Sequence, residues 1–183
     1  MIKAIRVFLI FICCFSLAYA YSSEISIGNE NEASKIKIYE FFDYECIHCR
    51  KMAPIVSKVV HDNNAELILK PVPIINNKSI AQAAGIIVAN RMISKNQIEK
   101  IHLLLMSGMS IDDAIRRLGI NEPIGFQMQM HQLWVKDFID ENVSFLNRHG
   151  GRIPLFIIQK GKNNIVFVGE RSEKEINHMI GRL

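Results

Sequence analysis

The spacing of hydrophobic residues changes its period around residue 43. Residues 35–42 are rich in β-branched and aromatic side chains and alternate at their start, which predicts a strand partly buried in a sheet. Beyond Cys49 the apolar residues fall on one face of a helix, at Met52, Ile55, Val56, Val59 and Val60. The sequence therefore predicts a strand that leads into a helix, with Cys46 and Cys49 at the junction.

A second strand and a long helical block are predicted next. Residues 66–74 are apolar and end at two prolines, which cannot donate to a sheet ladder. Helical spacing and capping residues then predict four helices: one capped by Ser79, one over 98–105, one opened by Ser110 and ending before Gly119, and one through 128–146.

Strand patterns return near the C-terminus. Residues 155–158 and 165–168 flank a polar turn and predict a hairpin. Ser172 and Glu175 form a capping box for a last helix. The predicted order is strand, helix, strand, a mainly helical block at about 76–150, then two strands and a helix. We expect a single α/β domain over 35–183.

The first 20 residues resemble a secretory signal. Lys3 and Arg6 precede an apolar core at 7–17, and Ala18-Tyr19-Ala20 matches a cleavage site. The apolar run is short for a membrane span. We expect cleavage after Ala20, export to the periplasm, and a short polar lead-in over 21–34.

Cleavage would leave one pair of cysteines. The chain has four, and Cys13 and Cys14 depart with the signal. A disulfide between Cys46 and Cys49 closes almost no loop, so it would stabilise the fold little. A helix N-terminus favours the thiolate form of a cysteine, and Cys46 is the more exposed of the two in the predicted helix. The pair therefore indicates redox chemistry, with Cys46 as nucleophile and Cys49 as the resolving thiol.

His48 lies between the two cysteines. An imidazole there can favour the Cys46 thiolate, which stabilises the reduced protein and makes the disulfide more oxidising. The alternative is a solvated surface histidine. The other histidines, which have no suggestive neighbours, are assigned to the surface or to helix ends: His61, His102, His149 and His178.

These features resemble the thioredoxin fold, and the inserted helical block resembles the DsbA family of exported thiol oxidoreductases. The run Glu40-Phe41-Phe42-Asp43-Tyr44 before the Cys-x-x-Cys, the segment 70–74 and the Ile153-Pro154 entry to the hairpin resemble its Com1-like branch. The resemblance implies a thioredoxin-like fold with an inserted all-helical subdomain. It also implies a thiol–disulfide oxidoreductase.

The resemblance assigns further site residues. Pro154 would be cis and face the disulfide, and the backbone of Ile153 would pair with a substrate strand. Together with Ile47, these residues would contact substrate. The alternative for Pro154 is a trans proline that opens an edge strand.

Two charged residues match positions that the family places beneath its active site. Glu40 and Lys70, buried together on neighbouring strands, would exchange the proton of Cys49. Alternatively, each points to solvent at a sheet edge.

Two departures from the family leave the oxidising strength open. Ile47 stands where strongly oxidising members usually have proline. Glu45 places a negative charge directly before the nucleophile, which disfavours a second anion. We expect an oxidase, with a disulfide isomerase or reductase as the alternative, because the lead-in is too short and polar for the dimerisation segment of isomerases.

The expected partners follow from this interpretation. Substrates would be reduced or unfolded exported proteins, re-oxidation would come from a quinone-linked DsbB-type membrane protein, and the chain would act as a monomer. No cofactor beyond the disulfide and no metal is expected. Loss of the signal lowers the formal charge from +4 to +2, which does not favour nucleic acid.

Non-catalytic alternatives remain. Cys46, His48 and Cys49 have the ligand types that Cu(I) or Zn(II) accept. Met128, Met130 and His131 offer a second soft cluster, but they cannot share one helical face. The chain could also be a periplasmic holdase with an unused thiol pair.

Overall fold

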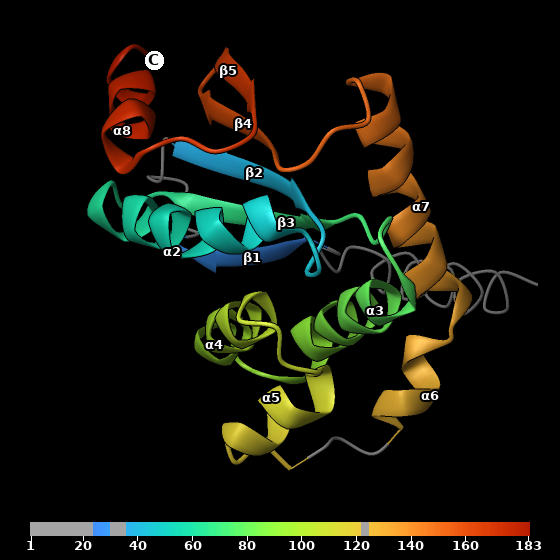
Figure 1. Cartoon of the computed structure of the whole chain (residues 1–183). Coiled ribbons are helices and arrows are strands. Elements are labelled where there is room, and N and C mark those ends of the chain that lie inside the picture. Colours follow the sequence, from blue (N-terminus) through green and yellow to red (C-terminus); the bar gives the residue numbers. More distant parts are fainter. Residues whose placement is uncertain (1–23, 30–35, 122–124) are drawn as a thin grey trace, which may run out of the picture.

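The computed structural model describes residues 24–29, 36–121 and 125–183. The expected signal and its cleavage after Ala20 lie outside these ranges. A five-stranded mixed sheet forms the centre, in the order β1-β3-β2-β4-β5 (Figure 1). β2 and β3 are parallel and the other pairs are antiparallel. The strands are β1 (Ile25–Gly28), β2 (Ile36–Phe42), β3 (Glu66–Pro71), β4 (Leu155–Lys160) and β5 (Asn163–Val168).

Strand β1 lies within the expected polar lead-in and was not predicted. Its isoleucines, Ile25 and Ile27, are buried and lie opposite Leu69 and Leu67 of β3. Four residues with two apolar positions are too short a pattern to distinguish from a loop. The edge of β3 provides the partner that makes this segment a strand.

The two faces of the sheet are covered differently. Helices α2 (Ile47–Asp62) and α8 (Glu173–Gly181) contribute to the main core with Ile38 and Phe42 of β2. On the other face, Phe41 and Leu155 form a small second cluster with Leu146 of α7 (Leu133–Arg148). Side chains alternate along a strand, so residues 40 and 41 face opposite layers.

Five helices of the described residues form the insertion between β3 and β4 in the sequence. In Figure 1 they lie below the sheet and to its right. They are α3 (Asn77–Met92), α4 (Lys95–Met106), α5 (Ile111–Arg117), α6 (Phe126–Met130) and α7. The predicted caps at Ser110 and Ser172 are confirmed. The predicted cap at Ser79 is wrong by three residues. Asn76 is the N-cap, and Ser79 completes its capping box.

The predicted helix over 128–146 is two helices. α6 ends at Met130, and Gln132 adopts an extended conformation that caps α7. The apolar spacing continues across the break, so the pattern did not reveal it. The rest of the predicted order is confirmed, including the hairpin of β4 and β5.

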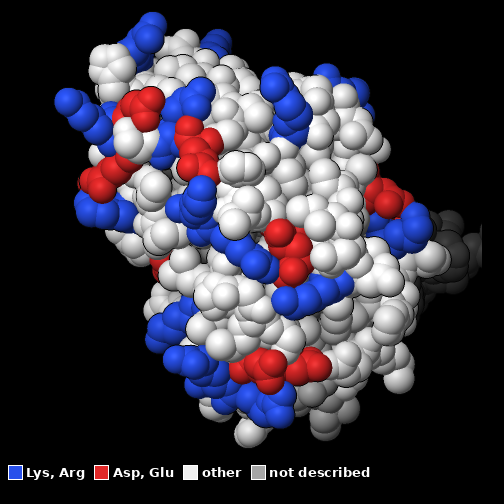
Figure 2. Space-filling model, in the orientation of Figure 1, with Lys and Arg blue, Asp and Glu red and all other residues white. Residues whose placement is uncertain are grey.

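The surface and the helices carry two further general features. On the face shown in Figure 2, acidic and basic side chains are interspersed with uncharged surface. Within the described ranges, no helix has the length and apolar character needed to cross a membrane.

Candidate active site

Cys46 is the N-cap residue of α2. Its Sγ accepts a hydrogen bond from the backbone N–H of Cys49 at 3.3 Å, and its own N–H donates to the carbonyl of Asp43 at 3.1 Å. Cys46 is 7% exposed and Cys49 is completely buried. Both thiols are free. The junction of strand and helix thus presents one thiol at the helix N-terminus and holds the other beneath it.

The pKa values of the two thiols are shifted in opposite directions. A hydrogen bond from the Cys49 thiol, helped by the N–H groups of Cys49 and His48 and by the charge of His48, lowers the pKa of Cys46 to about 6 against the cost of burial. Burial, and donation to Cys46, raise the pKa of Cys49 far above its usual range. Near neutral pH, Cys46 is therefore a thiolate and Cys49 a thiol.

Glu40 lies in the layer beneath the thiols. It is completely buried, and neither carboxyl oxygen has a hydrogen-bond partner among the described residues. Burial, and then the charge of Cys46, raise the pKa of Glu40 to about 8. Its charge also contributes to the raised pKa of Cys49. A buried, protonated carboxyl group is thus electrostatically coupled to both cysteines.

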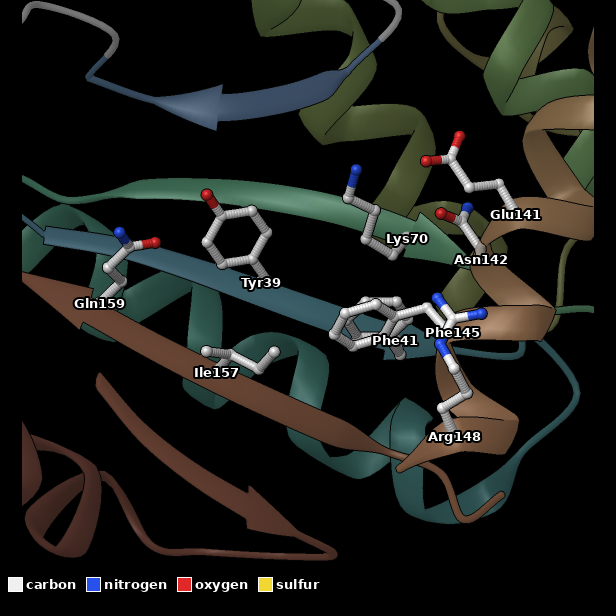
Figure 3. Close-up of a pocket in the computed structure, with 9 residues that line it drawn as sticks. All are labelled: Tyr39, Phe41, Lys70, Glu141, Asn142, Phe145, Arg148, Ile157 and Gln159. Atoms are coloured by element: carbon white, nitrogen blue, oxygen red, sulfur yellow. The ribbon is translucent and has the colours of Figure 1, made fainter. Parts of the chain in front are cut away.

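Lys70 is not paired with Glu40, and that prediction is wrong. In the β2–β3 register, Glu40 lies beside Leu69 and Lys70 beside Phe41, so the two charged side chains leave opposite faces of the sheet. The Lys70 ammonium instead pairs with Glu24 at 3.0 Å. Figure 3 shows Lys70 at a pocket of about 260 Å³ between this face and α7, together with Phe41.

His48 is well exposed, with 59% of its side chain accessible, and it forms an ion pair. Its Nδ1 lies 2.6 Å from Oε1 of Glu170, in the loop between β5 and α8, and Lys51 lies 3.2 Å from the same oxygen. Glu170 was missed by the sequence analysis, because 122 residues separate it from His48. The two alternatives for His48 therefore hold together. Its side chain is solvated, and its charge favours the Cys46 thiolate.

The Glu170→Gln variant tests this contact. The charge of His48 lowers the pKa of Cys46, and the Glu170 carboxylate holds the His48 ring in an ion pair, so without the carboxylate we expect the pKa of Cys46 to rise by a few tenths of a unit, the scale of an exposed ion pair. The rate of Cys46 alkylation against pH measures the shift. Glu173→Gln, which breaks the exposed pair with Lys58, is the matched control. A lower Cys46 pKa in Glu170→Gln would mean that Glu170 acts directly as a repelling charge.

The carboxylate of Glu45 does not stand unpaired beside the nucleophile. Arg50 lies 2.6 Å and Lys78 3.0 Å from its Oε1. Arg50 also donates from Nε to the carbonyl of Tyr44 at 2.6 Å. Two cations therefore compensate the charge that the sequence predicted to oppose the thiolate.

Asp43 holds the loop that carries Cys46, a role that the sequence analysis missed. It is buried, and its Oδ1 accepts from the N–H of Glu45 at 2.8 Å. Its Oδ2 accepts from the N–H groups of both Ile74 and Ile75 at 2.9 Å. An acidic residue at the end of a buried strand was the available signal, because a buried carboxylate requires such partners. Asp43 thus joins the active-site loop to the loop after β3.

Asp43→Ala is expected to lower the free energy of unfolding by roughly 2–4 kcal/mol, because it leaves three buried or half-buried N–H groups without their charged acceptor. Urea denaturation measures the loss. Asp113→Ala, which removes the exposed carboxylate paired with Arg116, should change stability by less than about 1 kcal/mol. Equal losses in the two variants would contradict a structural role for Asp43.

Tyr44 and His102 form a buried polar pair. The Tyr44 hydroxyl lies 3.2 Å from Nδ1 of His102, and both side chains are fully buried. Burial lowers the pKa of His102 to about 3, so its ring is neutral and Nδ1 can accept from the hydroxyl. The surface or helix-end position predicted for His102 is therefore wrong. The pair joins the active-site loop to α4.

The predicted substrate contacts surround the entry to β4 and the start of α2. The Ile153-Pro154 peptide bond is cis, as the resemblance implied. Ile153 is half-buried and packs against both core clusters. The Ile47 side chain is exposed. Contact of Ile47, Ile153 and Pro154 with substrate stays a prediction.

The described residues include no group of three or more His, Cys, Asp or Glu side chains that could hold a metal ion. In the second soft cluster, Met128 is exposed and Met130 is partly buried against the core.

Comparisons with known proteins agree with this geometry. The family model described as Thioredoxin matches residues 21–111, and no curated protein sequence matched. A thioredoxin-like oxidoreductase from Silicibacter pomeroyi is 22% identical with a TM-score of 0.74, over 88% of this chain and 92% of its own. The thiol-disulfide exchange protein alpha-DsbA2 from Wolbachia pipientis is 21% identical with a TM-score of 0.76, over 88% and 87%.

A periplasmic thioredoxin-like protein from Salmonella enterica serovar Typhimurium is 19% identical with a TM-score of 0.74, over 90% of this chain and 91% of its own. At these identities the likeness concerns the fold, including the helical insertion between β3 and β4. The chain therefore has a thioredoxin-like fold with an inserted helical subdomain, and this fold is similar along most of its length to the folds of the thiol-disulfide exchange protein and the thioredoxin-like proteins named above.

Proposed function

We propose that the chain is an exported thiol–disulfide oxidoreductase that exchanges a Cys46–Cys49 disulfide with cysteine pairs of secreted or envelope proteins, acting as an oxidase. The observation that supports the proposal best is that the pKa values of the two thiols are shifted in opposite directions. Cys46 has a pKa of about 6 at the N-terminus of α2, while the buried Cys49 stays protonated.

The exchange has two steps. A substrate thiolate attacks Sγ of Cys46 in the disulfide, which forms a mixed disulfide and breaks the Cys46–Cys49 bond. Cys49 leaves as a thiolate and takes a proton, for which the protonated carboxyl of Glu40 is the coupled donor. A second substrate thiolate then attacks the substrate sulfur and releases Cys46 as a thiolate. Two electrons pass from substrate to protein.

The proposed direction of exchange, oxidation of the substrate, rests on the stability of the Cys46 thiolate that the second step releases. A low Cys46 pKa stabilises the reduced protein and makes its disulfide more oxidising. Arg50 and Lys78 compensate Glu45, so the charge before the nucleophile does not cancel this effect. These contacts support an oxidase over the isomerase or reductase alternative.

The cellular setting is part of the same proposal. The predicted leader over 1–20 and the periplasmic thioredoxin-like protein from Salmonella enterica support export to the periplasm. A quinone-linked DsbB-type membrane protein would restore the disulfide, and the chain would act as a monomer without metal or other cofactor.

The reduction potential tests the direction. We expect equilibration with glutathione buffers to give a value nearer to the about −120 mV of DsbA than to the about −270 mV of thioredoxin. We also expect the oxidised protein to introduce a disulfide into a reduced two-cysteine protein in stoichiometric amounts. A thioredoxin-like potential would assign the chain to reduction, and an absence of exchange with glutathione would overturn the proposed activity.

A further inference from the structure

A pocket of about 260 Å³ lies between the sheet and α7, on the face that carries the second cluster of buried residues. Tyr39 of β2 and Ile157 of β4 lie opposite each other and form part of its floor. Phe41 continues the floor beside Lys70 of β3. The two cysteines belong to the main core on the other face, because residues 40 and 41 point to opposite layers. The sheet therefore separates this pocket from the thiols.

Helix α7 forms the wall of the pocket with Asn142, Phe145 and Arg148, which recur every three residues and so lie along one side of the helix. The Phe145 ring stacks on Phe41 of the floor, with ring centroids 4.7 Å apart and planes 7° from parallel (Figure 3). The volume is near the lower end of ligand pockets, about 300 Å³. The pocket therefore suits a single ring with a short side chain, and its aromatic lining favours a flat ring.

Among the described residues, three charged side chains line the pocket, and only one of them is a cation without a nearby carboxylate. The Lys70 ammonium is ion-paired with Glu24 at 3.0 Å, and Figure 3 shows Glu141 at the same edge of the pocket. The exposed Arg148 lies beside Phe145, with its Cζ 5.9 Å from the ring centroid, and it forms no ion pair with any described residue. The positive charge available to a ligand is therefore that of Arg148.

The other polar groups of the pocket are neutral. Burial raises the pKa of Tyr39, so its hydroxyl stays protonated. The amide of Gln159 donates to the carbonyl of Gly161 at 3.1 Å, and that of Asn142 donates to a backbone carbonyl at the end of β3 at 3.2 Å. A guanidinium is a planar fork that binds a carboxylate through two hydrogen bonds. Arg148 thus gives the pocket its preference for an anion.

We propose that this pocket binds a small aromatic carboxylate, with the ring packed against Phe145 and the floor and the carboxylate on the Arg148 guanidinium. A ring two carbons away from its carboxylate, as in 3-phenylpropionate, has this chemistry. The site goes beyond the proposed function, since it lies on the face of the sheet away from Cys46. A ligand here should bind the reduced and the oxidised protein alike.

The test titrates the protein with three probes and follows the backbone amide signals by NMR. The probes are 3-phenylpropionate, its uncharged amide 3-phenylpropionamide, and hexanoate, which has the carboxylate without the ring. We expect 3-phenylpropionate to bind with a dissociation constant on the order of 1 mM or lower, and the other two about tenfold more weakly. The shifted signals should belong to β2, β4 and α7.

The variant Arg148→Met keeps most of the apolar stem and removes the charge. Arg117→Met is the matched control, because both arginines are exposed and lie in the last turn of a helix, and Arg117 of α5 is outside the pocket. We expect Arg148→Met to bind 3-phenylpropionate about tenfold more weakly than wild type, and no better than it binds the amide. Arg117→Met should bind all three probes as wild type does.

Equal affinities of wild type for 3-phenylpropionate and its amide, or for 3-phenylpropionate and hexanoate, would overturn the proposal. An unchanged affinity of Arg148→Met for 3-phenylpropionate would overturn it as well. So would the absence of binding at about 10 mM, tenfold above the expected dissociation constant. Signals that shift at residues 46–49, or a changed rate of Cys46 alkylation, would place the ligand at the thiols and also overturn it.

Discussion

Cys46→Ser is expected to abolish disulfide exchange, while Cys49→Ser keeps the Cys46 thiolate, which attacks substrate disulfides, releases one substrate thiolate and accumulates as mixed disulfides. In Cys46, the helix N-terminus and the hydrogen bond from Cys49 stabilise the thiolate that reacts. A serine has no sulfur and provides no such nucleophile. Without the Cys49 thiol, nothing in the protein displaces the substrate from Cys46. Oxidation of a reduced two-cysteine protein measures the first effect, and non-reducing electrophoresis the second.

Cys46→Ser should keep its fold, which makes the loss of activity interpretable. Cys46 is the N-cap of α2, and serine is among the best N-cap residues, so the contact with the N–H of Cys49 can be retained. We expect a melting temperature at least equal to that of the reduced wild type. A Cys46→Ser protein that still performed the wild-type function in cells would contradict the oxidoreductase and support the holdase alternative.

Glu40→Gln is expected to stabilise the reduced protein and to flatten its dependence on pH. Folding raises the pKa of Glu40 from the ordinary 4.5 to about 8, so the folded state favours the protonated carboxyl. Stability from this group is therefore fully present below about pH 4.5 and is lost as the pH rises towards about 8. The cost at pH 7 is roughly 3 kcal/mol, which glutamine avoids.

Urea denaturation of the two reduced proteins between pH 5 and pH 9 measures this effect. The curves should converge towards the acid end and separate as the pH rises. Glu66→Gln is the control, because it makes the same substitution in the neighbouring strand β3 at a carboxylate that is ion-paired with Lys37 at 3.2 Å. Parallel curves for wild type and Glu40→Gln would contradict a protonated Glu40 and weaken its role as proton donor to Cys49.

Much of the fold and the thiol pair were available from local sequence. The change of apolar period between 35–42 and Met52 located the junction of β2 and α2, because each period matches one backbone geometry. The caps at Ser110 and Ser172 were readable because a cap is a contact within three residues. The placement of Cys46 at a helix N-terminus followed from the same local rules.

Only the tertiary structure decided the contacts between distant segments. β1 exists because β3 offers it an edge, and Lys70 is separated from Glu40 because the β2–β3 register aligns it with Phe41. His102 is buried because α4 packs it against Tyr44, and Glu170 reaches His48 only where the loop after β5 passes α2. These arrangements depend on register and on which faces meet, and neither is encoded in the spacing of residues along a single element.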